Sequence, residues 1–256
     1  MTDVKLTLKI KKPLKIGYQG TPGSNAETAT KAIVERLNLL NVELVPLTTS
    51  QNVCDHLVAG SIDFGVMARQ NSISGMVSET LKALPDKELH RVTFQVVPIN
   101  HCLFKLPNVP MSSLTTIASH EEALCQTKNI RARMFPQLNE LKTEDTALSA
   151  KQLAEHILPE TTAVLCSKQA GLQHNLELVC EHVADKINNN TLFDLTCYYE
   201  NKQDLLLEHT SSLRNLFESY QTAIDKSNAI HQRFEKIMIE RRPLNDTRNL
   251  PNSDFR

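Results

Sequence analysis

The segment Asn189-Asn190-Thr191-Leu192-Phe193 carries a single hydroxyl group at the start of a stretch that is typical of a buried strand. A hydroxyl is a poor free acid, so its chemical value lies in a positioned hydrogen bond that strengthens as charge develops on a reacting atom. A threonine that opens a strand is otherwise an ordinary structural residue. The segment therefore predicts either a hydrogen-bond donor to a departing group or a simple strand start.

A second candidate site is the turn-rich segment Gly20-Thr21-Pro22-Gly23-Ser24, which follows a short apolar stretch at residues 14–18. Asn25, with Thr28 three residues later, is a typical helix entry. Gly-rich turns at helix starts present backbone amides to anionic ligands. The amides of this turn and the Thr21 hydroxyl are therefore candidate donors to an acidic molecule.

Composition excludes several classes of function. The net charge is −1 and the isoelectric point is about 6.8, which gives no electrostatic indication of nucleic acid or an anionic membrane as a partner. The six cysteines are scattered without a C-x-x-C pair, which argues against a zinc site or a redox dithiol, and most lie in apolar runs typical of reduced, buried thiols. Residues 1–12 lack the apolar core of a signal peptide, and no apolar stretch approaches the roughly 20 residues that span a membrane. We expect a cytoplasmic protein.

The elements that must position these groups alternate between strands and helices. Strands are predicted at residues 14–18, 42–45, 62–67, 92–99, 101–106, 115–118, 162–166, 177–179 and 192–199. Helices are predicted at residues 25–40, 50–58, 121–128 and 149–157, and from residue 169 onward. This alternation predicts an α/β fold with mainly parallel sheets.

The two ends of the chain differ from this pattern. Alternating apolar and polar residues over residues 1–12 predict a half-exposed strand or extended arm. An apolar stripe with a spacing of three and four predicts a long helix over residues 201–242, ended by Pro243 and packed against its own body or a twin subunit. Residues 243–256 are predicted to be a disordered tail.

Five segments recur in the order of a known family. The first three are Gly17-Tyr18-Gln19-Gly20-Thr21-Pro22-Gly23, residues 63–66 with Gln70-Asn71-Ser72-Ile73-Ser74-Gly75, and His101-Cys102-Leu103. The last two are Ser119-His120 with Ala123-Leu124 and Gln126, and residues 189–193. In order and approximate spacing this set resembles the motifs of the prephenate dehydratase and arogenate dehydratase family, over residues 14–196.

The resemblance implies two α/β lobes like those of a type II periplasmic binding protein, with the substrate held in the cleft. By the family's layout the catalytic domain spans residues 13–200, with lobe one at residues 13–92 plus 180–200 and lobe two at residues 93–179. The family's C-terminal ACT regulatory domain is not expected, because residues 201–256 are predicted to be helix and tail. Feedback by phenylalanine through that domain is therefore not expected either.

The family's reaction removes a ring carboxylate as carbon dioxide and a ring hydroxyl as water, driven by aromatisation, so neither a cofactor nor a metal is implied. Thr191 matches the family's threonine at the leaving group. Structural or supporting roles are implied for Asn189, Phe193 and His120. His101 is expected to be a core histidine whose hydrogen bonds are satisfied. Substrate binding is assigned to Thr21, Arg69, Gln70, Asn71, Ser72, Ser119 and Gln126. Asn71 and Ser72 alternatively cap the helix that follows them. The implied partners are a small dicarboxylate and a second subunit in a homodimer, with no nucleic acid and no membrane.

The sequence departs from the family's pattern around the threonine. Leu192 replaces the motif arginine, which removes a charge-assisted contact of about 1.5–3 kcal/mol. Gln70 replaces a glutamate and Ala26 a serine, while Arg69 stands where the family has an apolar residue. Arg69 could supply the charge missing at position 192.

Three functions remain open at this point. The leading interpretation is a prephenate dehydratase. A diverged enzyme would instead decarboxylate prephenate or a related cyclohexadienyl acid without loss of water. A binding module would retain the cleft for a small carboxylate and lack turnover.

Overall fold

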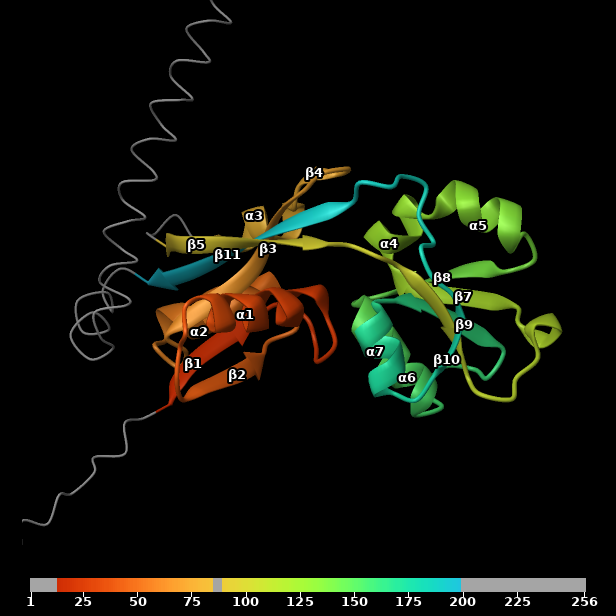
Figure 1. Cartoon of the computed structure of the whole chain (residues 1–256), viewed down its shortest axis with the longest axis horizontal. Coiled ribbons are helices and arrows are strands. Elements are labelled where there is room, and N and C mark those ends of the chain that lie inside the picture. Colours follow the sequence, from red (N-terminus) through yellow and green to blue (C-terminus); the bar gives the residue numbers. More distant parts are fainter. Residues whose placement is uncertain (1–12, 85–88, 199–256) are drawn as a thin grey trace, which may run out of the picture. The chain divides into compact units, whose positions relative to one another are not determined.

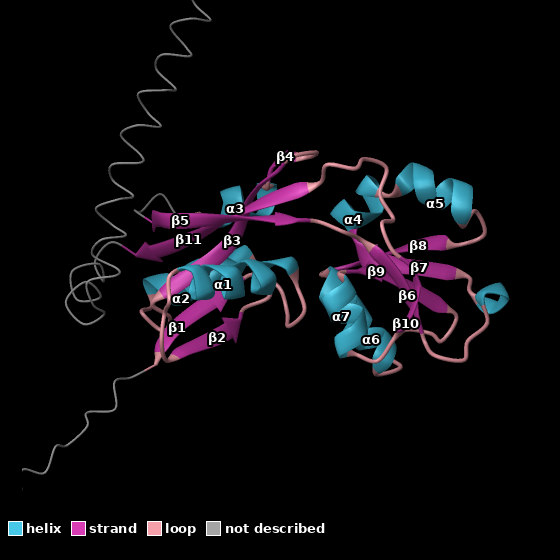
Figure 2. Ribbon diagram, in the orientation of Figure 1, coloured by secondary structure: helices cyan, strands magenta, loops and turns pink. Residues whose placement is uncertain are grey.

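The computed structural model describes residues 13–84 and 89–198, which form two β-sheets flanked by helices (Figures 1 and 2). The elements of the first lobe are β1 (Leu14–Tyr18), α1 (Asn25–Arg36), β2 (Val42–Pro46), α2 (Ser50–Val58), β3 (Phe64–Asn71), β4 (Gly75–Met76), α3 (Ser78–Ala83), β5 (Leu89–Pro98) and β11 (Asn190–Tyr198). Its sheet has the order β2-β1-β3-β11-β5, with β4 paired to β3.

The second lobe lies between β5 and β11 in the sequence. Its elements are β6 (Cys102–Lys105), the 3-10 turn η1 (Met111–Ser113), β7 (Thr116–His120), α4 (Glu121–Gln126), α5 (Lys128–Met134), β8 (Asn139–Thr143), α6 (Thr146–Ala154), β9 (Thr162–Cys166), α7 (Lys168–Gln173) and β10 (Glu177–Cys180). Its sheet has the order β10-β6-β9-β7-β8. Together the two sheets confirm the predicted two-lobed α/β fold.

The expectation of mainly parallel sheets was wrong. β1 runs parallel to β2 and β3, and β7 runs parallel to β8 and β9. However, β11 is antiparallel to both β3 and β5, and β6 is antiparallel to both β9 and β10. The reason is that β11 returns from the second lobe and inserts between β3 and β5 in the opposite direction. Local periodicity carries no information on such a return.

The predicted lobe boundaries also need correction. β5 pairs with β11 along its length, so a boundary at 92/93 would cut a strand of the first sheet. β10 pairs with β6 in the second sheet, and the buried Val183 beyond it packs into that lobe's core, so a boundary at 179/180 comes too early. The chain changes sheets between Pro98 and Cys102, and again between Val183 and Asn190.

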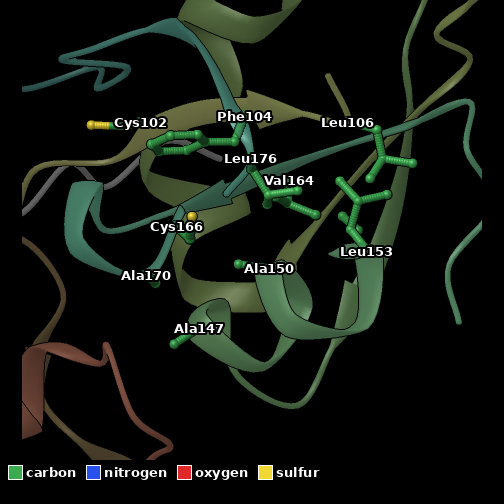
Figure 3. Packing of buried hydrophobic residues seen from close by; sticks show 11 residues of the cluster. Cys102, Phe104, Leu106, Ala147, Ala150, Leu153, Val164, Cys166, Ala170 and Leu176 are labelled. Atoms are coloured by element: carbon green, nitrogen blue, oxygen red, sulfur yellow. The ribbon is translucent and has the colours of Figure 1, made fainter. Parts of the chain in front are cut away.

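Strand alternation builds a core on each face of the second sheet. Cys102, Phe104, Val164 and Cys166 pack with residues of α6 and α7 (Figure 3), while the alternate residues of β6 and β9 pack with those of α4 on the opposite face. Gly171 of α7 is required here, because a Cβ at that position would lie 2.4 Å from the Phe104 ring. Close packing of this kind fixes the scaffold from which α4 projects.

Side-chain caps set where several helices begin. The Ser24 hydroxyl accepts from Glu27 N at the start of α1, and the Asp145 carboxylate accepts from Leu148 N at the start of α6. Each satisfies a backbone donor that the helix itself leaves unpaired. Ser24 therefore caps α1 one residue before the expected entry. The predictions for residues 1–12, 201–242 and 243–256 lie outside the described residues.

Candidate functional site

The candidate site begins where β3 ends and β11 starts, because Thr191 pairs in register with Asn71. The Thr191 side chain is 7% exposed and that of Asn71 is 5% exposed. The Asn71 Nδ2 group donates to Thr191 Oγ1 at 2.9 Å. A buried hydroxyl is therefore held by an amide from the neighbouring strand.

Backbone contacts fix the orientation of the Asn71 amide. Its Oδ1 accepts from the backbone N–H groups of Ile73 at 2.8 Å and Ser74 at 3.1 Å. Two backbone donors at one atom require that atom to be the oxygen, so Nδ2 must face Thr191 and Asn189. Nδ2 also donates to Asn189 Oδ1 at 2.7 Å. Asn71 thus binds the turn that follows it and does not cap α3, which begins at Ser78.

A second amide, from α4 of the other lobe, extends this network. Asn189 Nδ2 donates to Gln126 Oε1 at 2.6 Å, and Gln126 Nε2 donates to Glu122 Oε1 at 2.8 Å. Since the Gln126 oxygen is the acceptor, His101 Nε2 carries the proton in its 3.0 Å bond to that oxygen. Burial lowers the pKa of His101, which keeps the ring neutral. The network consists of uncharged groups, with the Glu122 carboxylate at one end.

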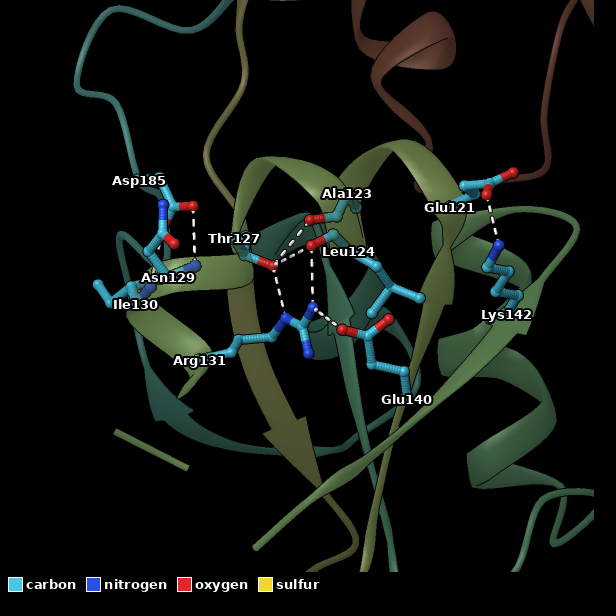
Figure 4. Close-up of polar contacts among 10 residues, drawn as sticks. All are labelled: Glu121, Ala123, Leu124, Thr127, Asn129, Ile130, Arg131, Glu140, Lys142 and Asp185. Atoms are coloured by element: carbon cyan, nitrogen blue, oxygen red, sulfur yellow. Dashed lines mark hydrogen bonds and ion pairs between the residues drawn. The ribbon is translucent and has the colours of Figure 1, made fainter. Parts of the chain in front are cut away.

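The helix turn that carries Gln126 is anchored by a buried arginine (Figure 4). Arg131 donates to the Leu124 carbonyl at 2.9 Å, to Thr127 Oγ1 at 2.8 Å and to Glu140 Oε1 at 2.6 Å. The Gln126 carbonyl in turn accepts from Asp185 N at 2.9 Å. These bonds hold the end of α4, and with it the Gln126 amide, in one position.

The arrangement leaves the Thr191 proton available. A threonine hydroxyl has one donor and two acceptor positions, and Asn71 occupies an acceptor position. Among the described residues no hydrogen bond uses the Thr191 proton. The Thr191 hydroxyl therefore retains one donor position without a partner among the described residues.

Three predicted binding residues make other contacts. Ser72 is exposed; its hydroxyl donates to the Asn188 carbonyl at 2.8 Å and accepts from Asn190 N at 2.9 Å, which ties the start of β11 to β3. Ser119 is fully buried, and its hydroxyl donates to the Leu165 carbonyl at 2.7 Å. In both residues the protein itself uses the hydroxyl proton.

Thr21 is the third of these residues. Its hydroxyl donates to Asp145 Oδ1 at 3.0 Å, which joins the Gly-rich turn to the start of α6. The turn has φ of +90° at Gly20 and +89° at Gly23, a backbone conformation that glycine adopts without strain. Asp145 places a carboxylate beside the turn, so the Thr21 side chain is not directed at an anion here.

Arg69 lies on the other side of β11 from Thr191. Its Nε is 4.0 Å from Asp194 Oδ2, and Arg91 approaches the same carboxylate at 3.3 Å. Thr191 and Asp194 are three residues apart on one strand, so their side chains point to opposite faces. Burial raises the pKa of Asp194 to about 6, although Arg91 and Arg69 oppose the shift. This pairing argues against Arg69 as a replacement cation beside Thr191.

The remaining predicted residues have structural contacts. Gln70 is exposed and pairs in register with Leu192, on the face opposite Thr191. Phe193 is buried on the same face as Thr191. The His120 ring accepts from Glu122 N and caps α4.

Sequence reasoning missed two members of the network. His101 is a satisfied core histidine as expected, but its partner is Gln126, which makes it part of the site's support. Glu122 stands four residues before Gln126 on α4, a spacing that places two side chains on one helix face and could have revealed the pair. Among the described residues, no group of three or more His, Cys, Asp or Glu side chains could hold a metal ion, and no helix is long and apolar enough to cross a membrane.

Two lobes joined by a buried amide–hydroxyl network define this chain as a two-lobed α/β protein. The family model of prephenate dehydratase matches residues 16–198. The chain belongs to the prephenate dehydratase family.

Individual relatives agree with this assignment. Arogenate dehydratase 5, chloroplastic, of Arabidopsis thaliana is 28% identical over 180 residues, which cover 70% of this chain and 41% of the relative. The prephenate dehydratase of Lactococcus lactis is 27% identical over 237 residues, covering 90% of this chain and 82% of the relative. The chain therefore spans less than half the length of the plant relative.

The fold is shared with a solved structure. The crystal structure of a prephenate dehydratase from Arthrobacter aurescens, in complex with L-Phe, superposes with a TM-score of 0.64 at 24% identity. The match covers 72% of this chain and 60% of that protein. At this identity the likeness concerns the fold alone.

Proposed function

We propose that this chain is a prephenate dehydratase-like lyase, which converts prephenate to phenylpyruvate in phenylalanine biosynthesis. The observation that carries the proposal is the 2.9 Å bond from Asn71 Nδ2 to Thr191 Oγ1. It holds a hydroxyl whose own proton has no partner among the described residues, at the position that the resemblance assigns to the family's threonine. Family membership supports the same reaction class.

The proposed chemistry needs a single well-placed donor. The ring carboxylate leaves as carbon dioxide, its electron pair enters the ring, and the ring hydroxyl departs and takes up a proton to become water. The Thr191 hydroxyl donates a hydrogen bond to the departing oxygen as negative charge develops there. A positioned donor of this kind contributes about 2.7–4 kcal/mol, or roughly 10²–10³ in rate.

The network that holds Thr191 is built at low electrostatic cost. Asn71, Asn189, Gln126 and the neutral His101 satisfy one another, so no buried charge has to be compensated. Their mutual hydrogen bonds also limit how far the Thr191 hydroxyl can turn. The donor is thus oriented before the substrate binds, which avoids reorganisation during the reaction.

The alternatives differ from this proposal in what happens at the leaving group. Leu192 removes the cation of the family motif, which favours an enzyme that releases carbon dioxide and retains the hydroxyl. A binding module would hold prephenate and release it unchanged. Both alternatives are outcomes of one product analysis.

The test is incubation of the purified protein with prephenate at neutral pH. Phenylpyruvate is followed by its absorbance in alkali, and the remaining products by mass spectrometry. We expect phenylpyruvate and carbon dioxide in equal amounts. A decarboxylated product that retains its hydroxyl would establish the diverged enzyme, and unchanged prephenate bound in calorimetry would establish the binding module.

We further propose a cytoplasmic homodimer. No disulfide joins the six cysteines, and Cys54, Cys102 and Cys166 are buried, which suits a reducing compartment. Exposed apolar side chains on β5, such as Phe94 and Val96, support an interface on that sheet face. Fractionation of the source cells and sedimentation of the purified protein test the two statements.

A further inference from the structure

The segment that returns from the second sheet to β11 binds the joint where α4 ends and α5 begins. Asp185 of this segment makes the contacts. Its backbone N–H donates to the Gln126 carbonyl at 2.9 Å. Its carboxylate accepts from the backbone N–H groups of Asn129 at 2.9 Å and Ile130 at 2.7 Å (Figure 4). One residue therefore holds the last turn of α4 and the first turn of α5 together.

The helix α5 receives no cap from its own sequence. Thr127 precedes its first residue, but the Thr127 hydroxyl donates to the Ala123 carbonyl at 2.8 Å and makes no cap bond. The same hydroxyl accepts from Arg131 Nε at 2.8 Å. A helix leaves its first backbone N–H groups without internal partners. The Asp185 carboxylate satisfies two of them, and its negative charge lies at the helix end that favours an anion.

The joint between α4 and α5 carries Gln126, which reaches the Thr191 network. The Gln126 carbonyl accepts from Asp185 N, while its side-chain oxygen accepts from Asn189 Nδ2 at 2.6 Å. Asp185 and Asn189 are four residues apart, so one short segment holds both the backbone and the side chain of Gln126. Ile187, halfway between them, is 99% exposed, so packing of its side chain does not hold the segment there.

Arg131 binds the same turn of α4 in a different way. Its partners are the Leu124 carbonyl, Thr127 and Glu140, which all belong to the second lobe. Asp185 instead connects the turn to the segment that continues into β11. Loss of the Asp185 carboxylate would leave the Arg131 contacts in place and free α4 to move relative to β11.

We propose that Asp185 is a positioning residue for the Thr191 donor, an inference that rests on the proposed function of that hydroxyl. Asp185 fixes the Gln126 amide, and the Gln126 amide orients Asn189. Asn189 Oδ1 accepts from Asn71 Nδ2 at 2.7 Å, and the same Nδ2 group donates to Thr191 Oγ1 at 2.9 Å. A displacement of about 1 Å at a reacting group can reduce a rate by roughly 10²-fold.

The first test needs no substrate. Asp185→Ala removes the carboxylate, and NMR of the full chain follows solvent exchange of the Asn189 side-chain amide protons. Asp63→Ala is the matched control, because the Asp63 carboxylate also accepts a backbone N–H, from Lys15 at 2.7 Å, at the opposite end of β3 from Asn71. We expect exchange to be at least about tenfold faster in Asp185→Ala and unchanged in Asp63→Ala.

The second test measures kcat and KM for prephenate. In Asp185→Ala we expect kcat to fall about tenfold or more, because the donor is no longer held in place. KM should stay within about threefold of wild type, since Asp185 acts on the donor and not on binding. Asp63→Ala should retain both constants. If Asp185→Ala does not fold, Asp185→Asn, which retains one acceptor oxygen, replaces it, and both readouts should change in the same direction.

Two results would overturn the inference. The first is wild-type exchange of the Asn189 amide protons in a folded Asp185 variant. The second is an unchanged kcat in that variant, or a loss of kcat that Asp63→Ala reproduces. Failure of the proposed function gives a different result, because the wild-type chain would then leave prephenate unchanged. The exchange measurement would in that case still decide whether Asp185 holds Gln126 against Asn189.

Discussion

The substitution Asn71→Asp probes the proposed donor most selectively. It retains the size of the side chain and the oxygen that accepts from Ile73 and Ser74. It replaces the Nδ2 donor by an oxygen facing Thr191 Oγ1 at 2.9 Å and Asn189 Oδ1 at 2.7 Å. The Thr191 hydroxyl will then turn and donate its proton to the new carboxylate.

The magnitude follows from the groups left unpaired. A buried acceptor without a donor costs about 1–3 kcal/mol. Asn189 Oδ1 loses its donor and the new carboxylate is buried, whereas Thr191 regains a bond by reversing its direction, so we expect a stability loss of at least about 1–3 kcal/mol. Because the reversed hydroxyl no longer donates to the substrate, kcat should fall roughly 10²–10³-fold.

The assay is the rate of phenylpyruvate formation at saturating prephenate, with the melting temperature recorded for each variant. Asn52→Asp is the matched control, since it makes the same chemical change at an exposed position in the first turn of α2. The control should retain wild-type kcat. If Asn71→Asp folds and turns over prephenate at the wild-type rate, the direction of the Thr191 hydrogen bond has no catalytic role.

Three further predictions concern the charges and the core. Arg69→Ala should leave kcat and KM for prephenate within about threefold of wild type, because Arg69 faces Asp194. A loss of about tenfold or more, which is the size expected for a broken charge-assisted contact, would mean that Arg69 binds the substrate. The Asp194 pKa is raised from 3.8 to about 6 by burial, so the folded chain binds this proton more tightly than the unfolded chain. The contribution of Asp194 to the free energy of unfolding is therefore fully present below about pH 4 and falls by about 3 kcal/mol as the pH rises through 6. Urea unfolding at a series of pH values should show this dependence for the wild-type chain, and Asp194→Asn should lack it. Gly171→Ala should destabilise the chain by about 1–3 kcal/mol in the same assay, since the added Cβ would lie 2.4 Å from the Phe104 ring; an unchanged midpoint would mean that the ring moves freely.

Strands with strong apolar patterns were predictable from the sequence. Residues 14–18 and 162–166 match β1 and β9, because each is a short apolar run with a turn signal nearby. β8 was not predicted, since most of its residues are exposed on this outermost strand of the second sheet and it lacks an apolar alternation. α5, at residues 128–134, was missed because its apolar positions are few and its one buried residue is Arg131.

The sequence named part of the hydrogen-bonded network and none of its geometry, because Glu122 and the contact of His101 with Gln126 were missed. Ordered motifs identified Asn71, Gln126, Asn189 and Thr191, which the structure joins by hydrogen bonds. The position of Arg69 was not predictable, because β3 has an extra residue opposite the Leu192–Phe193 step of β11. Such a bulge redirects side chains without leaving a signal in the local pattern.

The central claim is that the Thr191 hydroxyl, held by Asn71, donates to the departing hydroxide of prephenate. Its most direct test compares Thr191→Ser with Thr191→Val in single-turnover formation of phenylpyruvate. Serine retains the hydroxyl and valine retains the shape, so the proposal predicts measurable turnover for serine and a loss of roughly 10²-fold or more for valine. Phenylpyruvate formation by Thr191→Val at the wild-type rate would contradict the account.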